Sequence, residues 1–233
     1  MYERVCIREQ LARPQAPRRE PLRYLFVVTY GRSGSTLLNG VLNSIPGYLI
    51  RGENRLVISE LHQWHRAIDR QMELFGEKKR SGPRSSWYGL HSYPREIALD
   101  RMRALVLDTL LRPGPRARVV GFKEIRWPAN DLDLLVEFLT ELFPDSKFLF
   151  NTRNAADVAK SEWWRDAPDA LEIIAARENA WAAVQQSLGE RAFAICYDDY
   201  AHDVDGLRPL FAWLDEDFDR ERLSNVLATR HGQ

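Results

Sequence analysis

The sequence has few cysteines and no long apolar run, and both absences limit what it can be. Its two cysteines, Cys6 and Cys196, lie far apart in the chain, and two thiols cannot form the disulfide framework of a small secreted domain. No uninterrupted apolar run reaches the ~18 residues that a membrane helix needs, and the first twenty residues hold no apolar signal-peptide core. We therefore expect a cytoplasmic protein without a membrane span.

The sequence also lacks a net charge. Lys plus Arg number 33 and Asp plus Glu number 33, so no overall field would draw the chain to nucleic acid or to anionic lipid. The spacing of its cysteines and histidines fits no metal site. We therefore expect neither a nucleic-acid partner nor a metal, and any site for an anion must be local. The oligomeric state is open.

Short apolar runs alternate with stretches of helical spacing along most of the chain. Strands are predicted at 22–30, 48–51, 118–125, 147–151 and 192–197. Helices are predicted at 36–42, 56–75, 94–111, 132–143, 155–164, 171–188, 204–214 and 218–229. Such alternation predicts an α/β fold with a mostly parallel sheet of about four or five strands and helices on both faces.

The domain organisation follows from the same pattern. A length of 233 residues suits one domain rather than two. Residues 1–21, rich in proline and arginine, are expected to form a flexible arm, and 22–233 the single domain. Within that domain, residues 54–117 form an expected helical and loop insertion, because a long polar and aromatic loop at 77–93 separates two helices.

A glycine-rich turn, Gly31 to Thr36 (GRSGST), joins the first predicted strand to the first predicted helix. Backbone N–H groups and the positive end of the helix dipole meet at such a turn, which therefore suits a phosphate or a sulfate. Gly34 permits close backbone approach, Ser33, Ser35 and Thr36 add hydroxyl groups, and Arg32 adds a positive charge. A plain turn between a strand and a helix has a similar composition.

The turn departs from the pattern of ATP-binding P-loops, G-x-x-x-x-G-K-[ST]. When Gly34 is placed on the second glycine, Thr29 stands at the first and Ser35 at the lysine. The turn instead resembles the 5'-phosphosulfate loop of sulfotransferases, in which Lys or Arg precedes Ser-Gly-[ST]-[ST]. That resemblance implies a P-loop-like fold, the donor 3'-phosphoadenosine 5'-phosphosulfate (PAPS), and contacts from Arg32 to the sulfuryl oxygens.

A second motif follows the strand at 147–151. Arg153-Asn154 begins a stretch with Asp157 and with Ser161 eight residues after the arginine. It resembles the 3'-phosphate-binding segment of sulfotransferases, and the resemblance implies that Arg153 and Ser161 hold the 3'-phosphate of PAPS. The plainer interpretation is a helix start capped by Asn154. Both can hold, since a capped helix start suits an anion.

Transfer of a sulfuryl group to a hydroxyl requires a base and charge neutralisation. Glu53 follows the second predicted strand, where related carbohydrate and bacterial sulfotransferases often carry a catalytic glutamate. The cytosolic branch of the family uses a histidine instead, so His62, His65 and His91 are rivals. Glu53 can equally be an ion-pair partner of Arg51 or Arg55. Lys123, in Gly-Phe-Lys-Glu, resembles a family strand end near the active site, and it either steadies the sulfuryl oxygens or pairs with Glu124.

The acceptor is expected to meet the insertion at 54–117, where sulfotransferases usually build the acceptor pocket. Aromatic residues there can stack on a sugar or an aromatic ring, namely Trp64, Trp87, Tyr88 and Tyr93. We expect a hydroxyl acceptor on a small molecule, a carbohydrate or a lipid, with the adenosine bisphosphate PAP as the second product. The alternative is a P-loop kinase or another ATP-binding protein, which the missing lysine argues against.

Overall fold

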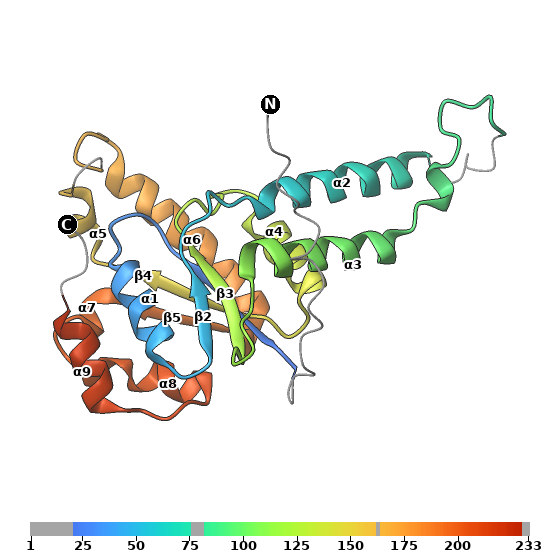
Figure 1. Ribbon diagram of the computed structural model, residues 1–233. Helices are drawn as coiled ribbons and strands as arrows, with labels where there is room; N and C mark the ends of the chain where they lie inside the picture. The colour runs from blue at the N-terminus through green and yellow to red at the C-terminus, as the bar shows by residue number, and fades with distance from the viewer. Residues whose placement is uncertain (1–20, 76–81, 162–163, 230–233) are drawn as a thin grey trace, which may run out of the picture.

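The computed structural model describes residues 21–75, 82–161 and 164–229 (Figure 1). Nearly all of the predicted arm at 1–21 lies outside the described residues. So do Arg230 and His231, which resemble the ending of bacterial sulfotransferases.

Five parallel strands form the centre of the molecule, in the order β2-β3-β1-β4-β5. Their bounds are β1 Arg23–Val28, β2 Tyr48–Arg51, β3 Val119–Glu124, β4 Lys147–Thr152 and β5 Ala192–Cys196. The predicted α/β class and the predicted parallel sheet are confirmed, and each strand lies where its apolar run predicts it. Because all pairings are parallel, the five carboxyl ends share one edge of the sheet.

Helices cover both faces of the sheet because the strand residues are apolar on both faces. Leu25 and Val27 of β1 belong to one core cluster, and Phe26 and Val28 belong to the other. The first cluster lies under α1 Ser35–Ser44, α7 Tyr197–Tyr200, α8 Arg208–Leu214 and α9 Arg220–Ala228. The second lies under α3 Arg95–Leu105, α4 Leu132–Leu142 and α6 Ala170–Leu188.

The helices at 94–111 and 155–164 differ from their predictions. The α-helix α3 ends at Leu105, and the chain continues directly into a π-helix, Val106–Leu111. α5 spans only Ala155–Ala159, so the predicted extension to residue 164 was wrong. The chain leaves the helix because Trp164 turns inward: it is buried, and its indole Nε1 donates to the carbonyl of Gly31 at 2.9 Å.

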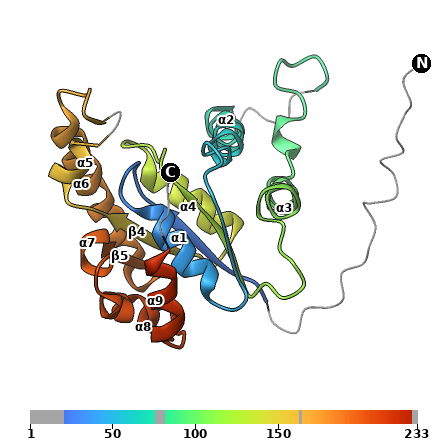
Figure 2. The same cartoon turned by 60° about the vertical axis from the view of Figure 1, so that its left-hand side comes forward.

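The segment between β2 and β3 extends away from the sheet. α2 Ile58–Phe75 and α3 run outward beside each other, and a short 3-10 turn, Leu90–Ser92, lies near their far end (Figures 1 and 2). Over the described residues, no helix is both long enough and apolar enough to cross a membrane.

Candidate active site

The two predicted anion loops lie side by side at the carboxyl edge of the sheet. β1 and β4 are neighbouring strands, so the turns that follow them meet. Arg153 Nη1 donates to the carbonyl of Arg32 at 3.2 Å, and the backbone N–H of Arg153 donates to the hydroxyl of Tyr30 at 3.0 Å. The helices after β1 and β4 cover opposite faces of the sheet, which is the arrangement that opens a ligand crevice in α/β folds.

The turn after β1 has the backbone shape of an anion cradle. Arg32 and Gly34 both adopt the left-handed conformation, with φ of 70° and 75°, and such alternation turns successive N–H groups toward one point. Gly34 is required for a second reason, because a Cβ there would lie 1.9 Å from the ring of Tyr197. α1 begins at Ser35 with its first N–H groups at this turn.

The side chains of the turn divide between the interior and the surface. Arg32 and Thr36 are exposed, whereas Ser35 is buried. Ser33 is fully buried, and its hydroxyl forms a 2.6 Å hydrogen bond with the Thr29 hydroxyl. The Ser33 hydroxyl therefore stabilises the turn from inside, whereas the Arg32 side chain lies at the surface.

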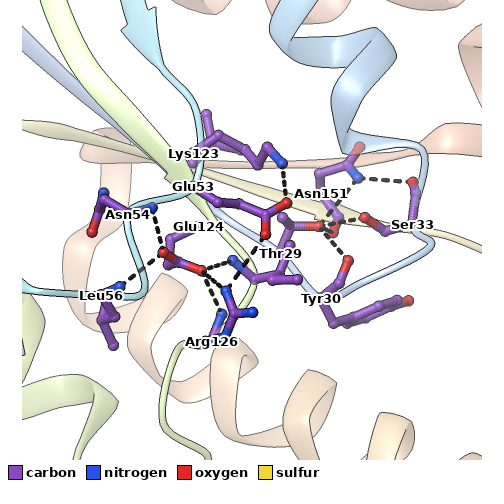
Figure 3. Close-up of polar contacts among 12 residues, drawn as sticks. Thr29, Tyr30, Ser33, Glu53, Asn54, Leu56, Lys123, Glu124, Arg126 and Asn151 are labelled. Carbon is purple, nitrogen blue, oxygen red and sulfur yellow. Dashed lines mark hydrogen bonds and ion pairs between the residues drawn. The ribbon is translucent and has the colours of Figure 1, made fainter. Parts of the chain in front are cut away.

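A buried amide, Asn151, ties the two turns together (Figure 3). The side-chain Nδ2 of Asn151 donates to the carbonyl of Ser33 at 3.0 Å, and the backbone carbonyl of Asn151 accepts from the Thr29 hydroxyl at 2.8 Å. The hydroxyl of Tyr200 donates to Asn151 Oδ1 at 3.1 Å. Because Asn151 lies on β4 and Thr29 follows β1, this network fixes one turn relative to the other.

The turn after β4 presents Arg153 beside an aromatic ring. Its guanidinium carbon lies 4.8 Å from the centre of the Tyr197 ring, and its Nε is buried without a hydrogen-bond partner in the described part of the chain. Asn154 caps α5 through the N–H groups of Ala156 and Asp157 at 3.0 and 3.3 Å, so the predicted cap is confirmed. The Ser161 hydroxyl donates to the carbonyl of Val158 at 2.7 Å, so it has a partner within its own turn.

Glu53 and Lys123 meet on the other side of the first turn. Lys123 Nζ donates to Glu53 Oε1 at 2.7 Å, and Arg126 Nη1 lies 3.5 Å from Glu53 Oε2. Lys123 is buried near the end of β3, while the side chain of Glu53 is 36% exposed. The alternative in which Lys123 pairs with Glu124 is wrong. Arg51 is not the partner of Glu53 either, because it donates to the carbonyls of Leu111 and Arg112.

Glu124 is a fully buried carboxylate next to this pair (Figure 3). It accepts hydrogen bonds from four backbone N–H groups, those of Asn54, Leu56, Ile125 and Arg126, at 2.8 to 3.1 Å. Burial by itself would raise its pKa, but these hydrogen bonds outweigh burial and lower the pKa below its ordinary value. Glu124 is therefore a carboxylate in the folded protein.

The three rival histidines lie among other partners. His62 and His65 pack on Phe138 of α4, with ring centres 5.2 and 5.3 Å from its ring. His65 Nε2 also lies 3.2 Å from Asp69 and 3.3 Å from Glu141. His91 is exposed in the 3-10 turn between α2 and α3. Among the described residues, none of the three contacts Glu53 or the turn after β1, and no group of three His, Cys, Asp or Glu side chains is placed to hold a metal ion.

Sequence reasoning missed the residues that hold this site together. Tyr30, Asn151 and Glu124 are buried partners of the turns, and their roles depend on which strands are neighbours. Tyr197 gave a signal, because Tyr197-Asp198-Asp199-Tyr200 resembles a family turn after the last strand. The structure shows what that turn contacts: Tyr197 packs on Gly34 and Arg153, and Asp198 accepts from the N–H of Asn154 at 2.7 Å.

Comparisons with known proteins agree with this geometry. A model of the sulfotransferase family matches residues 25–220. The sulfotransferase domain of the Synechococcus PCC 7002 olefin synthase superposes with a TM-score of 0.56 at 19% identity, covering 93% of this chain and 81% of that one. The sulfotransferase domain from the curacin biosynthetic pathway gives 0.56 at 15% identity, covering 90% and 79%. Curated proteins yield no match.

Proposed function

The chain belongs to the sulfotransferase family, and on that premise we propose that it transfers the sulfuryl group of PAPS to a hydroxyl group of a small molecule, a carbohydrate or a lipid. One observation carries the proposal. Arg32 and Arg153 follow neighbouring strands and touch each other through the Arg32 carbonyl, so two anion sites lie within reach of one doubly phosphorylated nucleotide.

The residues at this edge suit the two ends of PAPS. The left-handed turn at 32–34 and the first N–H groups of α1 offer donors to the 5'-phosphosulfate, and Arg32 adds a charge. Arg153, with a buried Nε that has no partner in the described chain, offers donors to the 3'-phosphate. An unpartnered buried donor is costly in a protein, and an anion would relieve that cost. Ser161 would bind the same phosphate as Arg153 if its hydroxyl turned away from the carbonyl of Val158.

Glu53 is the proposed general base, and it is catalytic in the sense that it would touch the acceptor hydroxyl. PAPS, when bound, supplies the sulfuryl group and a phosphate leaving group. The exposed carboxylate of Glu53 accepts the proton from the acceptor, while Lys123 holds one of its oxygens at 2.7 Å and leaves the other turned toward Arg126. Lys123 also brings a positive charge beside the turn that holds the sulfuryl group.

The acceptor is proposed to contact the segment at 54–117. Its aromatic side chains lie on α2 and at the far end of the segment: Trp64 is 6.0 Å from Tyr93 between ring centres, and Trp87 stacks on Phe75 at 3.9 Å. Trp64, Trp87 and Tyr88 are nevertheless well exposed. Exposed rings that are held by contacts with other rings suit a sugar or an aromatic acceptor.

The alternative is an ATP-dependent kinase, and the turn after β1 argues against it. Ser35, which stands where a P-loop places its lysine, is 5% exposed at the start of α1. A kinase would therefore lack the cation that pairs with the outer phosphates of ATP. The arginines of this site stand instead at 32 and 153.

Calorimetry and a transfer assay test the proposal together. We expect PAP and PAPS to bind, ATP to bind at least ~100-fold more weakly because it has no 3'-phosphate for Arg153, and labelled sulfate to move from PAPS to a hydroxyl acceptor. Phenols, sugars, lipids and hydroxylated peptides form the acceptor panel. Tight binding of ATP together with indifference to PAP would contradict the proposal.

A further inference from the structure

The turn that follows Glu53 has an unfavourable backbone. Arg55 and Leu56 both have positive φ, at 60° and 55°, and neither is glycine. A side chain in this left-handed region costs roughly 1–2 kcal/mol per residue, so two in succession require surrounding contacts that stabilise them. Leu56 is buried, but the side chain of Arg55 is exposed and contributes little burial.

Glu124 supplies those contacts from the end of β3. Its Oε2 accepts the N–H groups of Asn54 and Leu56 at 2.9 and 2.8 Å, one on either side of Arg55. Its Oε1 accepts the N–H groups of Ile125 and Arg126 at 2.8 and 3.1 Å. The carboxylate thus bridges two chain segments about 70 positions apart in the sequence, and both of its oxygens are occupied by backbone donors.

The neighbouring residue of β3 holds the Glu53 side chain. Successive side chains of a strand point to opposite faces, so Lys123 and Glu124 reach the segment after β2 from different sides. Lys123 Nζ binds the carboxylate of Glu53, and Glu124 binds the backbone immediately after it. Two adjacent residues of one strand therefore hold the Glu53 side chain and the main chain that follows it.

We propose that Glu124 is a positioning residue, which keeps the Glu53 carboxylate in place by holding the strained turn at 54–56. The inference rests on the proposed function, because Glu53 is the base of that reaction. We call the four hydrogen bonds that Glu124 accepts from backbone N–H groups the clamp. A positioning role differs from a purely structural one in a single consequence. Loss of the clamp should lower turnover of the folded enzyme without weakening nucleotide binding, which depends on the turns after β1 and β4.

The variant Glu124→Gln tests the clamp. Glutamine keeps the size of the side chain but replaces one accepting oxygen with a donating NH2 group, so two of the four N–H groups lose their acceptor. We expect kcat to fall by about 10- to 100-fold, as small misplacements of a reacting group do. KM for PAPS and Kd for PAP should stay within about twofold, because the contacts at Arg32 and Arg153 are unchanged.

The exchange rates of the backbone amides bonded to Glu124 test the same hydrogen bonds without any transfer reaction. In the wild-type protein the amides of Asn54, Leu56, Ile125 and Arg126 are bonded to a buried acceptor and should be protected. In Glu124→Gln the pair that faces the new NH2 group, at 54 and 56 or at 125 and 126, should exchange at least about tenfold faster. Adding Arg55→Gly to Glu124→Gln should recover part of the lost kcat, since glycine adopts positive φ without strain. If Glu124→Gln does not fold, Glu124→Asp, which keeps the charge but is one methylene shorter, is read in the same way.

Glu216→Gln is the matched control. Glu216 is also a largely buried carboxylate, with 9% of its side chain exposed, but its partners Arg23 and Arg118 lie at the opposite edge of the sheet. This variant should lower the unfolding temperature while kcat stays within about twofold of wild type.

The outcomes separate the inference from the proposed function. If wild-type protein transfers no sulfate, the function fails, while exchange at 54–56 still tests the clamp. Unchanged exchange of all four amides in Glu124→Gln would overturn the inference, and so would faster exchange at 54 and 56 with unchanged kcat. An equal loss of kcat in Glu216→Gln would show a general effect of stability and would also overturn it.

Discussion

Each edge of the sheet holds one carboxylate of low exposure, and the two edges do so with different kinds of donor. At the amino edge, Glu216 accepts from Arg23 at 2.9 Å, from Arg118 at 2.8 Å and from the Tyr48 hydroxyl at 3.2 Å. These donors stand at or next to the starts of three strands, so one carboxylate ties the strands to the chain after α8. At the carboxyl edge, the buried carboxylate Glu124 is bonded chiefly to backbone N–H groups.

The difference shows why ion pairs alone do not mark a site. The amino edge holds its largely buried carboxylate between two arginine side chains, so the charges stabilise the fold. The carboxyl edge uses backbone donors for the buried carboxylate and leaves Arg32 and Glu53 at the surface beside turns rich in N–H groups. On this comparison, substitutions at the carboxyl edge should change activity or binding, and substitutions at the amino edge should change stability.

Glu53→Gln should give the largest effect. Glutamine cannot accept the acceptor proton, so we expect kcat to fall by ~100-fold or more. PAP binding, measured by calorimetry, should stay within about twofold because Glu53 lies outside the two anion turns. Unchanged turnover in this variant would assign the base to another residue. It would also contradict the expectation that Glu53 at the carboxyl edge acts in the reaction.

Arg153→Ala should weaken PAP binding by about 30-fold, since a charge-assisted hydrogen bond to phosphate is worth ~2 kcal/mol. Arg118→Ala is its matched control. Both guanidinium groups lie over tyrosine rings, Arg153 at 4.8 Å from Tyr197 and Arg118 at 5.9 Å from Tyr48, but only Arg153 is at the carboxyl edge. Equal losses of PAP affinity in the two variants would mean that binding follows stability rather than the predicted site.

Local sequence patterns predicted the strands well because each strand is a short apolar run buried on both faces. The run at 147–151 needs no distant information to be recognised as a strand. The failure at 155–164 has a tertiary cause, since Trp164 leaves the helical path to reach Gly31, more than a hundred residues earlier in the chain. A local pattern contains no information about such a partner.

For the same reason, local patterns predicted some residues of the candidate site and missed others. Arg32 and Arg153 were predicted from motifs because each motif is local, and their proximity follows once β1 and β4 are neighbours. Glu53 was predicted as the base with Arg51 or Arg55 as its alternative partner, whereas its partner is Lys123, seventy positions away. Glu124 carries no motif of its own, because its role depends on N–H groups of a different segment and on burial, which the strand pattern alone does not show.

The smallest expected effect is on the pH dependence of stability. It tests whether Glu216 at the amino edge stabilises the fold through its charge. Burial by itself would raise the pKa of Glu216, but the hydrogen bonds and charges of Arg118 and Arg23 lower it below its ordinary value. A lowered folded-state pKa stabilises the protein above the unfolded pKa, and that stability is lost as the pH falls through the folded pKa. We expect Glu216→Gln to lose about 1.5 kcal/mol at pH 7, the low end for charged hydrogen bonds, because both arginines are partly solvated. Denaturant unfolding of both proteins from pH 7 to pH 3 should show the difference shrinking with acid, and a constant difference would mean that Glu216 acts through packing rather than charge.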